Sequence, residues 1–356
     1  MTKGFTRLVL AYALVTIAVA AISRRLNTGA VTTLAGTAHQ PGTADGVGAA
    51  AGFRFPLGVA VDGNGTVYVA DQSNHVIRRI SPAGAVSTVA GLALSPGTAD
   101  GSGSTARFRY PYGVAVDGAG TLYVSDQYNH TIRKITPAGV VSTFAGMPDR
   151  HGSADGTGSA ARFHNPAGIA VDAAGTVYVA DEGNHAIRKI SPAGVVSTLA
   201  GQAFSRGSQD STGVNAQFDH PTGLAVDAAG TVYVADQNNR TIRRISPAGK
   251  VTLLAGQVGR SGSKDTVNLY SRFNFPSAIA VDAVGALYVA DRFNHTIRVI
   301  SAAGQVSTLA GAALGSGTAN GVGTTARFNC PMGVAVDAAG AVYVTDQTNH
   351  TVRVIR

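Results

Sequence analysis

The sequence predicts an all-β fold, a six-bladed β-propeller whose blades are antiparallel sheets of four strands. The segment from Pro56 to Asp62, Pro-Leu-Gly-Val-Ala-Val-Asp, recurs with small variations six times at a constant step of 55 residues. No insertion or deletion interrupts the series. Each unit contains four short strand-like segments between turns, and such units repeated four to eight times are typical of propellers.

In the first unit the predicted strands are residues 58–62, 66–70, 75–80 and 85–90. The turn at 63–65 reads Gly-Asn-Gly, whose residues accept the positive φ angles of a tight reversal. The first strand is rich in small and β-branched residues, which suits a narrow innermost position in a blade. Ile77, Ile80 and Val86 are expected to fill the widening space between blades.

The two ends of the chain complement each other. The sixth unit stops at Arg356 without a fourth strand, whereas residues 30–35, Ala-Val-Thr-Thr-Leu-Ala, match residues 305–310, Gln-Val-Ser-Thr-Leu-Ala. Residues 27–356 make 330 positions, six times the repeat length of 55. The sequence therefore predicts one domain over 27–356, closed into a ring by an N-terminal strand that completes the last blade.

Residues 1–26 differ from the repeats and predict a targeting segment. Lys3 and Arg7 precede an uncharged apolar run over 8–22, and Arg24 and Arg25 follow it. A helix of that length covers about 22 Å, less than the roughly 30 Å of a bilayer core. We therefore expect a signal peptide cleaved after Ala20, with an uncleaved membrane anchor as the alternative. Either outcome makes the propeller extracytoplasmic: secreted, periplasmic or on the cell surface.

The second and third strands carry a motif that identifies a family. Residues 68–78 read Tyr-Val-Ala-Asp-Gln-Ser-Asn-His-Val-Ile-Arg, which resembles the NHL repeat. The resemblance covers all six units, although Arg240 stands where the fourth unit would have its histidine. It implies a propeller that recognises proteins, nucleic acids or cell-envelope ligands. A minority of such relatives are metal-dependent lyases or lactone hydrolases.

Most polar residues recur once per unit, which favours structural roles over catalytic ones. His75 and its four counterparts each follow an aspartate by four residues and precede an arginine by three, so a ring of structural hydrogen bonds is expected. Asp62 and Asp71 recur six times each. No catalytic residue and no metal ligand is predicted, so an enzyme is the less favoured interpretation. A calcium or zinc ion at the channel is the one cofactor left open.

A specific ligand usually needs an asymmetric pocket, so the binding residues are sought where the copies differ. Those differences lie beside the repeated proline and in the turns after the second strands, where Glu182 and Asn238 also vary. Strand directions place both regions on one face. The predicted ligand- or partner-binding residues are Tyr110, Tyr112, Tyr128, His164, Asp219, His220, Arg240, Arg292 and Phe293. His164, Asp219 and His220 form the only imidazole and carboxylate grouping outside the repeat pattern.

The formal net charge of +8 does not indicate nucleic-acid binding. Arg78 and its counterparts occupy one repeated strand position and therefore encircle the ring, and four more cations lie in residues 1–26. The favoured function is an exported, non-enzymatic binding module for a protein or a cell-envelope ligand, with membrane contact only through the N-terminal segment. The alternative is a metal-dependent lyase or lactonase-like hydrolase with its site at the channel mouth.

Overall fold

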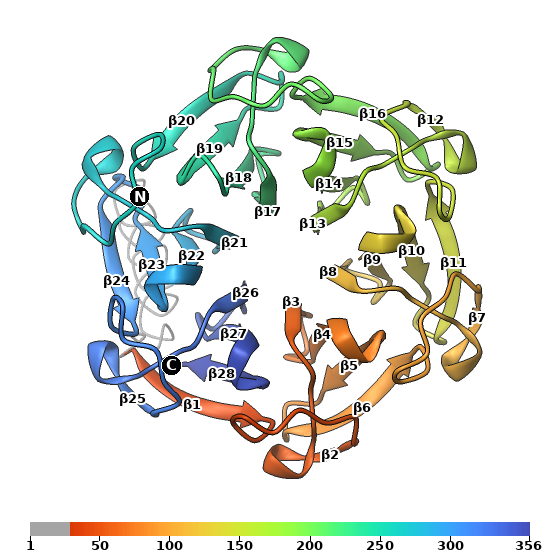
Figure 1. Cartoon of the computed structure of the whole chain (residues 1–356), viewed down its shortest axis with the longest axis horizontal. Coiled ribbons are helices and arrows are strands. Elements are labelled where there is room, and N and C mark those ends of the chain that lie inside the picture. The colour runs from red at the N-terminus through yellow and green to blue at the C-terminus, as the bar shows by residue number, and fades with distance from the viewer. Residues whose placement is uncertain (1–28) are drawn as a thin grey trace, which may run out of the picture.

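A computed structural model describes residues 29–356 and confirms the six-bladed propeller (Figure 1). The targeting segment predicted over 1–26 lies outside the described residues. Between residues 29 and 356, no helix is long and apolar enough to cross a membrane. The six blades surround a central axis, and each blade is an antiparallel sheet.

The innermost strand of every blade begins at the repeated proline, and the second strand returns to end at the repeated aspartate. The innermost strands are β3 (Pro56–Val61), β8 (Pro111–Val116), β13 (Pro166–Val171), β17 (Pro221–Val226), β21 (Pro276–Val281) and β26 (Pro331–Val336). The second strands are β4 (Val67–Asp71), β9 (Leu122–Asp126), β14 (Val177–Asp181), β18 (Val232–Asp236), β22 (Leu287–Asp291) and β27 (Val342–Asp346).

The third and fourth strands complete each blade toward the rim. The third strands are β5 (Val76–Ile80), β10 (Thr131–Ile135), β15 (Ala186–Ile190), β19 (Thr241–Ile245), β23 (Thr296–Ile300) and β28 (Thr351–Ile355). The fourth strands are β6 (Ala85–Ala90), β11 (Val140–Ala145), β16 (Val195–Ala200), β20 (Val251–Ala255), β24 (Val306–Ala310) and β1 (Ala30–Ala35). These bounds differ from the predicted strands of the first unit by no more than two residues.

Four blades carry a fifth strand that the sequence did not predict. In each of them two residues of the long loop pair with the outermost strand: β2 (Gly46–Val47), β7 (Gly101–Ser102), β12 (Gly156–Thr157) and β25 (Gly321–Val322). The other two blades keep only an isolated bridge at this place, Thr212 to Lys250 and Val267 to Gln305. Single 3-10 turns fill the loops, at η1 (Gly48–Ala50), η3 (Gly103–Thr105), η5 (Gly158–Ala160), η7 (Gly213–Asn215), η8 (Asn268–Tyr270) and η10 (Gly323–Thr325).

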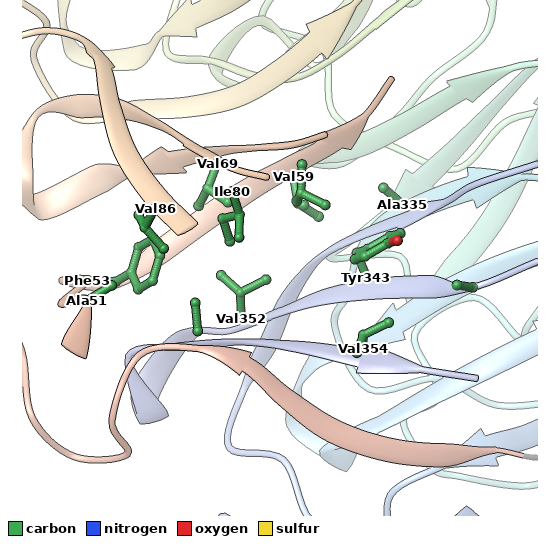
Figure 2. Close-up of a cluster of buried hydrophobic side chains, with 13 residues drawn as sticks. Ala51, Phe53, Val59, Val69, Ile80, Val86, Ala335, Tyr343, Val352 and Val354 are labelled. Atoms are coloured by element: carbon green, nitrogen blue, oxygen red, sulfur yellow. The ribbon is translucent and has the colours of Figure 1, made fainter. Parts of the chain in front are cut away.

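The predicted closure of the ring is confirmed. Strand β1 pairs with β28, with Val31 opposite Ile355, so both ends of the propeller lie in one sheet. The last blade then packs on the first: Figure 2 shows Phe53, Val59 and Val69 facing Tyr343 and Val352 across the seam. All six loop phenylalanines of the Phe53 type are fully buried, as expected for loop anchors.

A buried ionic network at the Asp71 position holds each blade to its long loop. The Arg78 guanidinium donates hydrogen bonds of 2.9 Å to Asp71, to Asp45 and to the Gly52 carbonyl, and one of 2.7 Å to the Ala44 carbonyl. It also stacks over the Phe53 ring. Burial raises the pKa of Asp71 to about 6, while Arg78 and other donors favour the ionised form, so the pair is charged at neutral pH. Arg133, Arg188, Arg243, Arg298 and Arg353 repeat the aspartate pairing.

Candidate functional site

The turns before the first strands and after the second strands share one face of the propeller, which we call the upper face. It follows from strand direction, because Pro56 at the start of β3 lies opposite Asp71 at the end of β4. The second-strand turns are η2 (Gln72–Asn74), η4 (Gln127–Asn129), η6 (Glu182–Asn184), η9 (Arg292–Asn294) and η11 (Gln347–Asn349), with a plain turn in the fourth blade.

The repeated histidines link neighbouring blades along this face. His75 Nδ1 accepts a hydrogen bond of 3.2 Å from the backbone N–H of Tyr110, one blade further on. His130, His185, His295 and His350 accept in the same way from the residue before the next blade's proline. Burial lowers the pKa of His75, which keeps the ring neutral and its Nδ1 lone pair available. The structural role predicted for these histidines is thus confirmed.

An apolar channel opens at the centre of the upper face. Its volume is about 80 Å³, and it is lined by the residues after the repeated prolines, including Leu57, Tyr112, Thr222 and Met332. The innermost strands of neighbouring blades come close together here. A Cβ atom on Gly58 would lie only 2.5 Å from the Tyr112 carbonyl oxygen, so the approach requires glycine. Tyr112 is therefore a half-buried channel residue, deeper than the surface position the sequence suggested.

The first residue of each second-strand turn is glutamine in four blades. They are Gln72, Gln127, Gln237 and Gln347, and we call these four residues with Glu182 and Arg292 the mouth ring. Gln127 Nε2 donates to Glu182 Oε2 at 3.1 Å, joining two neighbouring turns. Burial raises the pKa of the Tyr112 hydroxyl, Glu182 raises it further and Arg292 opposes the rise, so both charges act on the channel mouth.

The charged members of the mouth ring are half-buried and two blades apart. Burial raises the pKa of Glu182, while His220, Gln127 and Arg292 lower it. Arg292 stacks over Phe293 at 4.8 Å, and its Nε is buried without a hydrogen-bond partner. No ion pair joins Glu182 to Arg292 within the described part of the chain.

Two predicted tyrosines form a depression beside the mouth. Tyr110 and Tyr128 contact each other edge to face at 5.0 Å, and with Gln72 and Arg109 they line an open hollow of about 400 Å³. Their exposed fractions are 37% and 49%. Phe293, exposed to 37%, packs on Phe275 of the same blade. The upper face thus presents aromatic surface that solvent reaches.

His164 lies with other histidines and makes no contact with Asp219. Its ring stacks on His151 at 4.8 Å and meets His130 at 5.9 Å. Gly183 makes room for it, since a Cβ atom there would lie 2.6 Å from the imidazole Cγ. His164, Asp219 and His220 lie in adjacent blades as expected, but only Asp219 and His220 contact each other.

Asp219 and His220 are paired, and the repeated His185 joins them. Asp219 Oδ1 lies 2.7 Å from His220 Nδ1, and Asn238 Nδ2 approaches both. His185, Asp219 and His220 are the single group in residues 29–356 with three ligand atoms close enough to hold a metal ion, within 4.8 Å of one another. His185 Nδ1 already accepts the His220 backbone N–H at 3.1 Å, so a metal at that nitrogen would break an inter-blade bond.

The strand-end aspartates considered as calcium ligands already accept hydrogen bonds from protein groups. Asp71 accepts from Asn74 and Arg78, and Asp62 accepts backbone N–H groups of its own turn at 2.9 Å. Arg240, the exception in the histidine series, donates to the Gly259 carbonyl at 2.9 Å and stacks over Phe275.

Sequence reasoning missed His151, His185 and the convergence of Glu182 with Arg292. His151 lies in a loop without a repeated motif, and His185 was assigned to the structural ring. A column-by-column alignment of the six units shows Gln72 replaced by an acid and a base at Glu182 and Arg292. The Gln72 position of this alignment could therefore have pointed to Glu182 and Arg292 as a charged pair.

Comparison with known proteins places these features in a family. The model described as "NHL repeat" matches residues 53–80, 108–135, 163–190, 218–245 and 328–355. NHL repeat-containing protein 2 of Bos taurus is 30% identical over 295 residues, covering 73% of this chain but only 40% of the relative, so the chain corresponds to less than half of that protein.

Solved structures of low identity share the fold. An auxiliary nutrient binding protein from Bacteroides thetaiotaomicron superposes with a TM-score of 0.69 at 18% identity, over 92% of this chain and 76% of the other. Virginiamycin B lyase from Staphylococcus aureus gives 0.54 at 13% identity, over 85% and 94%. The repeats matched and the six-bladed ring together establish that this chain belongs to the NHL-repeat family of β-propellers.

Proposed function

We propose that this propeller is a non-enzymatic recognition module whose upper face binds a protein or a cell-envelope ligand. The observation that carries the proposal is the gathering of non-repeating residues around the mouth, with Tyr110, Tyr128 and Phe293 exposed beside the channel. Aromatic and arginine side chains on a rigid scaffold provide much contact area at little entropic cost. Export, proposed from residues 1–26, would present this face outside the cytoplasm.

The N-terminal strand β1 shows from which face the chain enters the ring. It begins at Ala30, which lies opposite Val322. Because β1 occupies the fourth position of its blade and such strands run toward the upper face, the chain enters the ring from the opposite face. An N-terminal anchor would thus leave the upper face free, which supports this face as the binding surface.

The test uses the tagged propeller to capture ligands from soluble extract and from sedimented cell envelope. Tyr110→Ala with Tyr128→Ala is compared with Tyr270→Ala, which alters a tyrosine exposed to 67% on an outer loop. We expect a retained species that the double variant loses and Tyr270→Ala keeps. Retention of the same species by all three proteins would refute the upper-face assignment.

A lyase or lactonase-like hydrolase is the second candidate, and the Asp219–His220 contact favours it. A carboxylate that holds one imidazole nitrogen leaves the other to act as a base, as in hydrolytic dyads. This pair would act alone or with a metal bound beside His185. Metal analysis of purified wild type and His220→Gln discriminates, since stoichiometric zinc or calcium lost in the variant would favour the enzyme.

A further inference from the structure

The mouth ring contains one acid and one base in a setting that is otherwise uniform. Glu182 and Arg292 replace the glutamine that the other four blades carry at this position. Both project from turns whose backbone the repeats conserve, since η6 and η9 have the same left-handed residue after them, His185 and His295. The two substitutions therefore change the charge of the mouth without changing its frame.

The structure of the turns does not require a charge at Glu182 or at Arg292. Half-buried ions are costly unless a partner compensates them. Glu182 receives one hydrogen bond, from the neutral amide of Gln127, and lies in the fields of His220 and Arg292. Among the described residues, the Arg292 guanidinium contacts the Phe293 ring but has no hydrogen bond or ion pair. Because four blades form the same turn with glutamine, neither charge is required for folding.

The arrangement discriminates among ligand charges. A simple anion at Arg292 would meet the field of Glu182, and a simple cation at Glu182 would meet that of Arg292. Both charges act on the Tyr112 hydroxyl. A ligand with both charges would complement both residues at once. The apolar channel beneath the mouth, with Leu57 and Met332 in its wall, suits an uncharged hydrocarbon group.

We infer that the mouth ring binds a small zwitterion with an apolar side chain, an amino acid or the end of a short peptide. Arg292 takes the carboxylate, Glu182 takes the ammonium group, and the side chain enters the channel. The glutamine amides of the neighbouring blades supply donors and acceptors around the charged head. This inference rests on the proposed function, because it gives the chemistry of a ligand for the same face.

The test measures binding of four probes to the full propeller by calorimetry: L-leucine, N-acetyl-L-leucine, L-leucine methyl ester and L-leucyl-L-leucine. The acetyl group removes the positive charge and the ester removes the negative one. We expect at least one of the two zwitterions to bind at least about tenfold more tightly than both blocked forms, as loss of one charge-assisted contact implies. Tighter binding of leucine indicates a free amino acid, and tighter binding of the dipeptide indicates a peptide end.

Two variants assign the charges. Arg292→Gln and Glu182→Gln install the residue of the other blades, so both are expected to fold. Arg292→Gln should abolish the preference for the zwitterion over the methyl ester, and Glu182→Gln the preference over the acetyl form. The matched control Asp149→Asn alters an upper-face charge that is paired with Arg109 and should leave both preferences intact.

Equal binding of zwitterions and blocked forms, no binding of either zwitterion, or preferences that survive in both glutamine variants would each overturn the inference. The probes act on the wild type, so this result does not depend on how a variant folds. Failure here is distinguishable from failure of the proposed function. Suppose that a captured species is lost in the Tyr110→Ala, Tyr128→Ala variant but retained by Glu182→Gln and Arg292→Gln. The proposed recognition function would then hold, and the zwitterion inference would be refuted.

Discussion

His75 in the first blade accepts a hydrogen bond from the backbone N–H of Tyr110 in the second, and this contact is repeated around most of the ring. It requires the histidine to adopt a left-handed conformation, with φ of 60°, after its 3-10 turn. Such a backbone is unusual for a residue other than glycine or asparagine, so the side-chain bond offsets a local cost. The link also brings the non-repeating residue before each proline to the edge of the upper face.

The fourth blade lacks this link and offers the test of its strength. Arg240→His restores the acceptor opposite Phe275, and one net hydrogen bond contributes about 1 kcal/mol. We expect the variant to unfold at higher urea concentration, and His75→Asn, which tolerates the left-handed backbone, to unfold at lower concentration. A decrease in stability for Arg240→His would contradict the role assigned to the histidines.

The buried arginines make a sharper prediction. Arg188 pairs with fully buried Asp181 at 2.7 Å, and its removal leaves that carboxylate uncompensated. Arg188→Met should lower the free energy of unfolding by about 3 to 5 kcal/mol. Lys189→Met changes the exposed neighbouring residue and should alter it by less than about 0.5 kcal/mol. Chemical denaturation of the two variants makes the comparison, and equal effects would refute the network's importance.

The stability of the ring should fall with acid. Burial, His164 and His151 lower the pKa of His130 to about 4, whereas the unfolded chain keeps a value near 6.5. The unfolded state therefore binds the proton first, so the contribution of neutral His130 is complete above pH 6.5 and is lost as the pH falls toward 4. Unfolding of wild type and His130→Asn between these limits should show a shallower pH slope in the variant. Identical slopes would contradict the shift.

Closure by β1 predicts a strong effect of a short truncation. A chain starting at residue 29 retains β1, whereas one starting at 36 exposes the edge of β28 and the apolar side chains of Val352 and Val354. We expect the shorter chain to melt at clearly lower temperature and to aggregate, because an unpaired edge strand invites intermolecular pairing. Equal melting temperatures would show that the ring does not depend on β1.

Much of the fold follows from the sequence, because one 55-residue pattern repeats without interruption and the ends are complementary. The strands that were not predicted, such as β7, consist of two residues in a glycine-rich loop. They are too short to show the alternation of apolar and polar residues that marks a strand. Side-chain partners across blades were also inaccessible. Glu182 and Arg292 are 110 residues apart, and only the curvature of the closed ring brings both charges within reach of Tyr112.

The central claim is that repeated residues build the ring while the exceptions on the upper face recognise the ligand. A variant tests it directly by giving the four charged exceptions a residue found in other blades: Glu182→Gln, Asp219→Asn, Arg240→His and Arg292→Gln. Its melting temperature and its capture of ligand from extract and envelope are measured beside wild type. We predict a melting temperature within about 4 °C of wild type and loss of the captured ligand. A variant that melts much earlier yet still captures the ligand would contradict the claim.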